Sequence, residues 1–278
     1  MDNSTPFITD LYIYPVKSLG GIRLKKSEVT PRGLAYDRRW MLVDRSGLFM
    51  SQRKTPRMAL IKLRQTEEGF EAYLDSGELA PFKIPYLPET NELVPVKVQV
   101  WDDEVQARRV GKEADEWFTQ VLGLRCSLVY MPDSSNRLVE TAYAKSGEQV
   151  SFADGYPYLI IGQASLDDLN SRMEEALPMD RFRPNIVFGG TEPFAEDRWK
   201  HFKINGILFH AAKPCARCVL TTVNQKTAEK GPEPLTTLAT YRRKDNKILF
   251  GQNLLHRGDG ELKVGDTITV SEYKEAEL

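Results

Sequence analysis

The chain has 278 residues, of which 41% are hydrophobic and 28% charged, and its net charge is −1. This composition is typical of one large or two ordinary soluble globular domains, without an overall field that would attract nucleic acid or an anionic membrane. No segment approaches the roughly 18–20 apolar residues of a membrane helix, no secretory signal is visible, and three cysteines fit a reducing cytoplasm better than a disulfide scaffold.

The first half of the chain consists of many short apolar-polar segments separated by turn residues. Strands are predicted over 7–15, 22–29, 36–44, 48–51, 58–63, 70–74, 96–101, 105–110 and 126–131. Short strands at this spacing are typical of a β-barrel or sandwich. One helix interrupts them over 112–122, where apolar residues recur at helical spacing until Gly123.

The second half mixes strands with one strong helix. Residues 132–149 are polar with little periodicity, and we expect a linker or long surface loop there. A helix is predicted from a Ser165 cap to Leu177, with Pro178 closing it. Strands are predicted over 158–162, 186–188, 202–210, 219–223, 247–250 and 267–270. The sequence therefore predicts an α+β, predominantly β protein.

Cys215 and Cys218 are the most distinctive pair of residues. Arg217 lies between them, and a cation next to a thiol favours the thiolate. We expect the pair on a tight turn at the start of strand 219–223. The pair allows a dithiol redox centre, half a zinc site or a single thiolate ligand for a metal cofactor. Without a predicted helix, and with only His210 as a further ligand nearby, spacing alone favours two buried structural thiols.

Several basic residues are candidates for anion binding. Lys17 and Ser18 share a turn that can form an anion nest, and Arg38 lies in a predicted strand where it would need an acceptor. Arg183 offers a bidentate fork for phosphate, and Asn185 offers donors and acceptors for the edge of a heterocycle. Taken singly, each also fits a simpler interpretation, namely a solvated lysine, a local ion pair or a plain turn.

Six motifs in a fixed order make the chain resemble a known family. They are Tyr14-Pro15-Val16-Lys17-Ser18, Asp37-Arg38-Arg39-Trp40, Ala164-Ser165-Leu166-Asp167-Asp168-Leu169-Asn170-Ser171-Arg172, Phe182-Arg183-Pro184-Asn185-Ile186-Val187, Arg217-Cys218-Val219-Leu220-Thr221-Thr222-Val223 and Phe250-Gly251-Gln252-Asn253. With these motifs the chain resembles the MOSC-domain molybdenum enzymes, the family of the mitochondrial amidoxime-reducing component and its bacterial relatives. The resemblance extends over nearly the whole chain.

The resemblance implies an architecture and a cofactor. It implies a β-barrel-like MOSC-associated domain over residues 1–131 and a β-rich MOSC domain with a few helices over 132–278. It also implies a molybdenum-molybdopterin cofactor whose metal is bound by Cys218, with Cys215 only a neighbour. The positions that match the family's phosphate and pterin contacts are Lys17, Ser18, Arg38, Arg183, Asn185 and Arg217. Asn253 occupies another position of the cofactor pocket, where the animal enzymes have tyrosine.

The resemblance further implies an activity. We expect a reductase of N-hydroxylated compounds such as hydroxylaminopurines, hydroxylamines and amidoximes, with Cys218 as the catalytic ligand. We expect no iron–sulfur cluster in this chain, so an external ferredoxin, flavodoxin or reductase-type protein would supply electrons in the cytoplasm. Nucleic acid and membranes are not expected partners. The alternative is a carrier that delivers the molybdenum cofactor or a sulfur atom. Ala216, Asn253 and Gly155-Tyr156 depart from the residues of the animal enzymes, so their contacts with the cofactor are expected to differ.

Overall fold

A computed structural model describes residues 5–88, 93–140, 142–144 and 147–278. Within these ranges the chain is rich in strands and has few helices, which confirms the α+β, predominantly β prediction. The strands form four separate sheets, and no sheet in the described ranges closes into a barrel. Across the same ranges, no helix has the length and apolar character needed to cross a bilayer.

The largest sheet combines the start of the chain with its second half. Its path runs β19-β14-β15-β17-β12-β13-β1-β2, and β16 pairs with β17. Its strands are β1 (Phe7–Ile13), β2 (Ile22–Leu24), β12 (Tyr158–Gly162), β13 (Ile186–Gly189), β14 (Trp199–Ile204), β15 (Ile207–Ala216), β16 (Arg243–Lys244), β17 (Lys247–Arg257) and β19 (Ile268–Tyr273). Strand β1 runs antiparallel to β13, with Leu11 opposite Ile186, so residues from both predicted domains complete one sheet.

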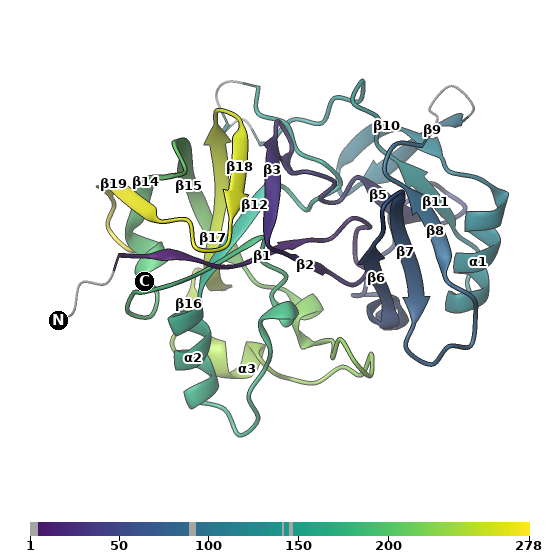
Figure 1. Ribbon diagram of the computed structural model, residues 1–278. Helices are drawn as coiled ribbons and strands as arrows, with labels where there is room; N and C mark the ends of the chain where they lie inside the picture. Colours follow the sequence, from purple (N-terminus) through teal and green to yellow (C-terminus); the bar gives the residue numbers. More distant parts are fainter. Residues whose placement is uncertain (1–4, 89–92, 141, 145–146) are drawn as a thin grey trace.

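Three smaller sheets complete the β structure. The four-stranded sheet has the order β5-β11-β10-β9, and the two three-stranded sheets are β6-β7-β8 and β18-β3-β4. Their strands are β3 (Lys26–Thr30), β4 (Gly33–Leu34), β5 (Trp40–Val43), β6 (Ile61–Gln65), β7 (Gly69–Leu74), β8 (Phe82–Pro85), β9 (Val94–Val100), β10 (Asp103–Arg109), β11 (Ser127–Tyr130) and β18 (Gly260–Lys263). Figure 1 shows β5 to β11 on the opposite side of the molecule from β14 and β19.

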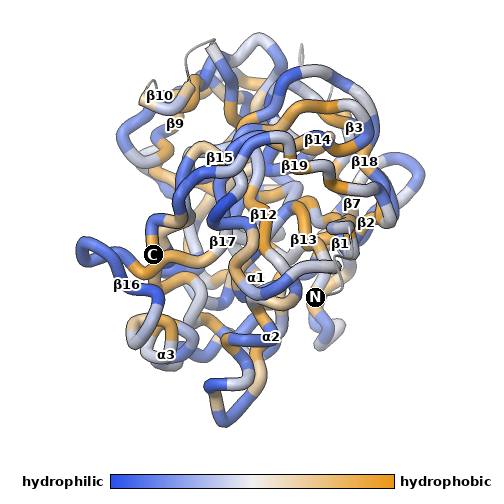
Figure 2. Tube along the Cα trace, turned by 90° about the vertical axis from the view of Figure 1, so that its left-hand side faces the viewer, coloured by the Kyte–Doolittle hydropathy of each residue, from blue (hydrophilic) through white to orange (hydrophobic). Residues whose placement is uncertain are grey.

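The helices lie at the periphery of the sheets. Helix α1 (Lys112–Leu122) has the predicted bounds, and Gly123 ends it with φ 68°, in the left-handed region that glycine adopts without strain. Helices α2 (Gln163–Ser171) and α3 (Leu235–Ala239) lie near each other beyond the end of the large sheet (Figure 1). Hydrophobic segments of the chain concentrate around β12 and β13, while the outer loops are hydrophilic (Figure 2).

Several predicted strands of the first half differ in the structure. Residues 36–38 form a turn, with φ 67° at Tyr36 and 51° at Arg38, so Arg38 precedes β5 instead of lying within a strand. The predicted strand 22–29 is divided into β2 and β3. The predicted strand 58–63 begins with the 3-10 helix η1 (Pro56–Leu60), and segment 48–51 makes only isolated bridges.

Several predicted elements of the second half also differ, including strand 247–250, which continues as β17 to Arg257. The predicted helix 165–177 starts earlier and ends at Ser171, while predicted strand 202–210 is the β14–β15 hairpin. The predicted strand 219–223 is the 3-10 helix η4 (Val219–Thr222). Segment 132–149 has no helix or strand among its described residues, as expected, but Arg137 within it is only 5% exposed.

Candidate functional site

One cavity between β12, β15 and the turns that precede β5 and β13 gathers the candidate residues. All eight predicted site residues line it: Lys17, Ser18, Arg38, Arg183, Asn185, Arg217, Cys218 and Asn253. They come from positions 17 to 253, so long-range folding and not local sequence brings them together. The structure places these residues together, while their binding roles remain predictions.

Three of the site residues have left-handed backbone. The φ angles are 66° at Ser18, 51° at Arg38 and 56° at Arg183. This conformation costs a non-glycine residue about 1–3 kcal/mol and persists only where surrounding contacts enforce it. The backbone N–H of Arg38, for example, donates to the carbonyl of Tyr14 at 3.0 Å. The strained backbone at these three residues lowers the stability of the fold, but it directs their side chains into the cavity.

Tyr14 supports the two arginines of the cavity floor. The guanidinium carbons of Arg38 and Arg183 lie 4.3 and 4.1 Å from the centre of its ring. Arg38 also donates to the carboxylate of Asp37 at 2.5 Å. Burial lowers the pKa of Arg183 to about 10, and its Nη2 atom has no hydrogen-bond partner among the described residues. A buried cation with an unused donor is suited to bind an anionic ligand.

Asn185 is mainly used to hold the cavity wall. Its Oδ1 accepts from the backbone N–H of Leu159 and from Arg38, both at 3.2 Å, and its Nδ2 donates to the carbonyl of Tyr12 at 3.2 Å. An asparagine amide can make about four hydrogen bonds. The predicted contact with a heterocycle would therefore depend on the remaining N–H.

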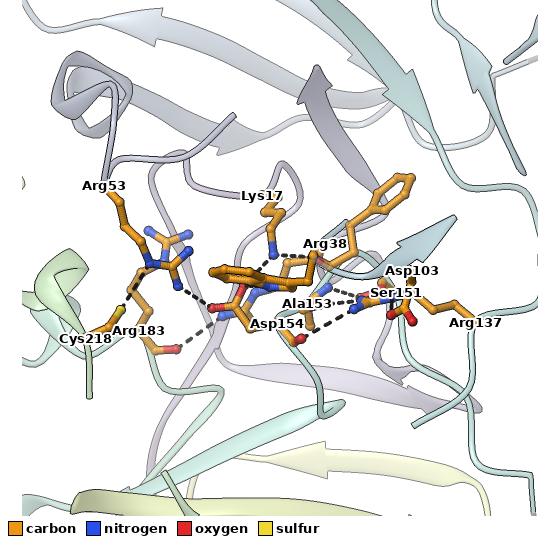
Figure 3. Close-up of polar contacts among 12 residues, drawn as sticks. Lys17, Arg38, Arg53, Asp103, Arg137, Ser151, Ala153, Asp154, Arg183 and Cys218 are labelled. Atoms are coloured by element: carbon orange, nitrogen blue, oxygen red, sulfur yellow. Dashed lines mark hydrogen bonds and ion pairs between the residues drawn. The ribbon is translucent and has the colours of Figure 1, made fainter. Parts of the chain in front are cut away.

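A chain of polar contacts crosses the cavity from Lys17 to Cys218 (Figure 3). Lys17 Nζ donates to Asp154 Oδ1 at 2.5 Å, Arg53 donates to Asp154 Oδ2 at 2.9 Å, and Arg53 Nε donates to Cys218 Sγ at 3.2 Å. Burial lowers the pKa of Lys17 to about 8, although Asp154 opposes this effect. Burial raises the pKa of Asp154, but Lys17 and Arg53 together hold it well below its usual range.

The two cysteines have different cationic neighbours. Arg217 Nη1 donates to the sulfur of Cys215 at 3.0 Å, whereas the cation at Cys218 is Arg53. The two cysteines were expected on a tight turn at the start of a strand, and this prediction was wrong. Cys215 lies on β15, and Cys218 precedes the 3-10 helix η4. Among the described residues, no group of three His, Cys, Asp or Glu side chains could hold a metal ion.

Arg53 and Asp154 line the cavity but were not predicted as site residues from the sequence. Arg53 lies in Ser51-Gln52-Arg53-Lys54, a polar segment that resembles any surface turn, and Asp154 precedes Gly155 in another turn. Their side chains become informative only when folding places both beside Cys218. The sole local signal was a basic pair at Arg53 and Lys54.

Comparison with known proteins defines the class. A model described as the MOSC N-terminal beta barrel domain matches residues 5–125, and one described as the MOSC domain matches residues 147–269. The chain therefore belongs to the MOSC-domain family. It is 34% identical to mitochondrial amidoxime-reducing component 1 of Mus musculus, over 94% of this chain and 81% of that protein. The Homo sapiens protein of the same name is 32% identical, over 94% of this chain and 82% of that protein.

A second group of relatives is longer than this chain. Molybdenum cofactor sulfurase of Oryza sativa subsp. japonica is 33% identical over 88% of this chain but only 32% of its own length. The resemblance of this chain to the MOSC family is thereby confirmed. The first group of relatives is named for amidoxime reduction, and the second group is named for the molybdenum cofactor.

Proposed function

We propose that this protein is a molybdenum-cofactor-dependent reductase of N-hydroxylated compounds. The observation that carries the proposal is the meeting of the Cys218 thiol with a set of cationic side chains in one cavity. These cations are Lys17, Arg38, Arg53, Arg183 and Arg217. A thiolate is a soft metal ligand, and arginine and lysine suit phosphate.

The residues present fit a molybdopterin-type group. Arg183 Nη2 and Arg217 Nε are buried without a hydrogen-bond partner among the described residues. Leaving such donors unsatisfied is costly, so a phosphate or a pterin edge that accepts from them would stabilise the site. Cys218 would bind the metal, while Lys17, Ser18, Arg38, Arg183, Asn185 and Arg217 would hold the phosphate and pterin. Asn253 would line the same pocket.

When bound, the group would supply two-electron chemistry that the side chains lack. For a hydroxylamine the overall change is R–NHOH plus two electrons and two protons, giving R–NH2 and water. Plausible substrates are hydroxylaminopurines, hydroxylamines and amidoximes, and the electrons would come from a ferredoxin, flavodoxin or reductase-type protein. Within the chain, Arg53 orients the Cys218 sulfur, and Lys17 holds a proton on Nζ against Asp154 Oδ1.

The proposal is tested by metal analysis and turnover on the same samples. The full chain is purified from a host that makes the cofactor, and molybdenum, released pterin and benzamidoxime reduction with a chemical electron donor are measured. We expect near-stoichiometric metal and turnover in the natural chain and loss of both in Cys218→Ser. Cys215→Ser is the matched control and should retain both. Full activity in Cys218→Ser would refute the role of this thiol.

The similarity to molybdenum cofactor sulfurase favours one alternative, a carrier of the cofactor or of a sulfur atom on Cys218. A carrier would transfer its cargo to an acceptor enzyme that lacks it, and would reduce no N-hydroxylated compound with any donor. Measuring both reactions on one preparation separates the two functions, because turnover without transfer supports the reductase and transfer without turnover supports the carrier.

A further inference from the structure

Arg137 is a buried guanidinium in the segment expected to be a surface loop. Its hydrogen bonds go to one carboxylate and to backbone carbonyls. Its Nε donates to Asp103 Oδ2 at 2.8 Å, and its Nη1 donates to the carbonyls of Ser151 at 2.7 Å and Ala153 at 2.5 Å. Its Nη2 lies 3.4 Å from the carbonyl of Asp154. Arg137 therefore fixes the direction of the carbonyls of Ser151, Ala153 and Asp154 in segment 151–154 (Figure 3).

The opposite side of that segment faces the cavity. The carbonyls of Ser151 and Ala153 point toward Arg137, and the intervening carbonyl of Phe152 accepts from Lys17 Nζ at 2.7 Å. Asp154 supplies the second acceptor of Lys17. Lys17, only 4% exposed, is thus held by the segment that Arg137 orients.

The same segment contacts a second residue of the cavity. The backbone N–H of Phe152 donates to the carbonyl of Arg38 at 2.9 Å, next to the left-handed turn that directs the Arg38 side chain. Arg137 itself does not line the cavity. Its influence on a ligand would therefore pass through segment 151–154 to Lys17 and Arg38.

We propose that Arg137 is a positioning residue for the anion-binding part of the cavity, acting on Lys17 and Arg38 through segment 151–154. The proposal rests on the proposed function in that the anion held there is the phosphate of a pterin cofactor. Loss of the guanidinium would leave the carbonyls of Ser151 and Ala153 without their partner, so the segment would open and release Lys17.

Arg32 provides a matched control. It is also buried, at 7% exposure, and it also donates to backbone carbonyls near the start of the same loop, those of Asp133 at 2.9 Å and Ser135 at 2.6 Å. Neither carbonyl belongs to a residue that lines the cavity. A general loss of loop packing would affect Arg32→Ala and Arg137→Ala alike, whereas positioning of Lys17 concerns Arg137 alone.

The first measurement is the rate at which an acetylating reagent modifies Lys17. It uses the full-length chain from a host that makes no pterin cofactor, with the modified peptide quantified by mass spectrometry. We expect Arg137→Ala to raise this rate at least ~10-fold through local opening of the segment. Millimolar guanidinium ion should lower it again by occupying the vacated space. Arg32→Ala should leave it unchanged. Equal rates in Arg137→Ala and the natural chain, or equal acceleration in both variants, would overturn the proposal.

The second measurement is the pterin content of the same variants from a host that makes the cofactor. We expect a loss in Arg137→Ala and retention in Arg32→Ala. If the natural chain carries no pterin, the proposed function fails, and the Lys17 measurement still decides whether Arg137 positions the cavity. If Arg137→Ala does not fold, Asp103→Asn replaces it, because Asp103 anchors Arg137 Nε, and a smaller acceleration is expected. No acceleration in a folded Asp103→Asn would count against the proposal.

Discussion

The Nε atom of Arg53 lies 3.2 Å from the sulfur of Cys218, although 165 positions separate the two residues. The same guanidinium donates to Asp154 and lies 4.5 Å from the centre of the Trp101 ring. Asp154 and Trp101 therefore hold the guanidinium beside the sulfur, and the sequence offers no local reason to pair these residues.

Replacing Arg53 is expected to impair the site more than the fold. A hydrogen bond to a charged group contributes about 1.5–3 kcal/mol, so Arg53→Gln should lower kcat/KM for benzamidoxime about 10–100-fold. Lys54→Gln, at the exposed neighbouring position, is the control and should change little. Metal content and unfolding in urea are measured alongside. Similar kinetics in Arg53→Gln and Lys54→Gln would contradict the role given to Arg53.

Tyr14 should matter through its ring more than through its hydroxyl. Tyr14→Phe removes only the hydrogen bond to the carbonyl of Pro184, at 3.1 Å, and should lower the free energy of unfolding by about 0.5–1.5 kcal/mol. Tyr14→Leu also removes the aromatic ring that contacts Arg38 and Arg183, and should lower the free energy of unfolding by about 2 kcal/mol more than Tyr14→Phe. Urea unfolding measures both losses. Equal losses in the two variants would show that the cation–π contacts contribute nothing.

Glu196 should make stability depend on pH. It is 1% exposed, and burial, followed by the charge of Asp197, raises its pKa from 4.5 to about 7. Because the folded state binds the proton more tightly, the stability that Glu196 contributes is complete below pH 4.5 and is lost as pH rises through about 7. Between pH 5 and 8, the free energy of unfolding of the natural chain should therefore fall by about 2–3 kcal/mol more than that of Glu196→Gln. Urea unfolding of both chains at the two pH values measures this change. The same change with pH in both chains would contradict the role given to Glu196.

Gly251, within the Phe250-Gly251-Gln252-Asn253 motif, should not tolerate a side chain. Its φ is 80°, and a Cβ there would lie 2.7 Å from Ile161 Cγ1 and 2.9 Å from the carbonyl oxygen of Ile160. Gly251→Ala should lower the free energy of unfolding by about 1–3 kcal/mol from backbone strain alone. Gly231→Ala, where a Cβ would meet nothing within 4 Å, should be nearly neutral. Thermal unfolding of both variants provides the comparison, and equal melting temperatures would contradict this account.

Elements fixed by local signals were predictable. Helix α1 carries its apolar face and its terminating glycine within twelve residues, and the β9–β10 hairpin has clean alternation around its turn. Segment 219–223 was wrongly predicted as a strand because its β-branched residues favour strands. In the structure the hydroxyls of Thr221 and Thr222 donate to the carbonyls of Cys218 and Val219, both at 2.9 Å, and thereby support the 3-10 helix.

Tertiary contacts decided the remaining differences. Ser165 was expected to cap a helix, but its hydroxyl donates to the buried carboxylate of Glu196, 31 positions away. The candidate site residues were predicted from motifs, and the fold brings them to one cavity, whereas Arg53, Asp154 and Arg137 became candidates only once the fold placed them around Lys17 and Cys218. No pattern along the chain could have indicated those long-range pairings.

The pairing of β1 with β13 affects how the protein can be made. During synthesis, β1 can pair early with β2 through residues 11–13, but its residues 7–11 cannot pair with β13 until residues 186–189 have left the ribosome. Most of the first half can form its local hairpins earlier, but the cavity cannot assemble until the second half is present. Expression of residues 132–278 alone would leave the edge of β13 uncovered and would omit Lys17, Arg38 and Arg53. Such a fragment would be prone to edge-to-edge aggregation, so activity should be sought in a chain that retains both halves.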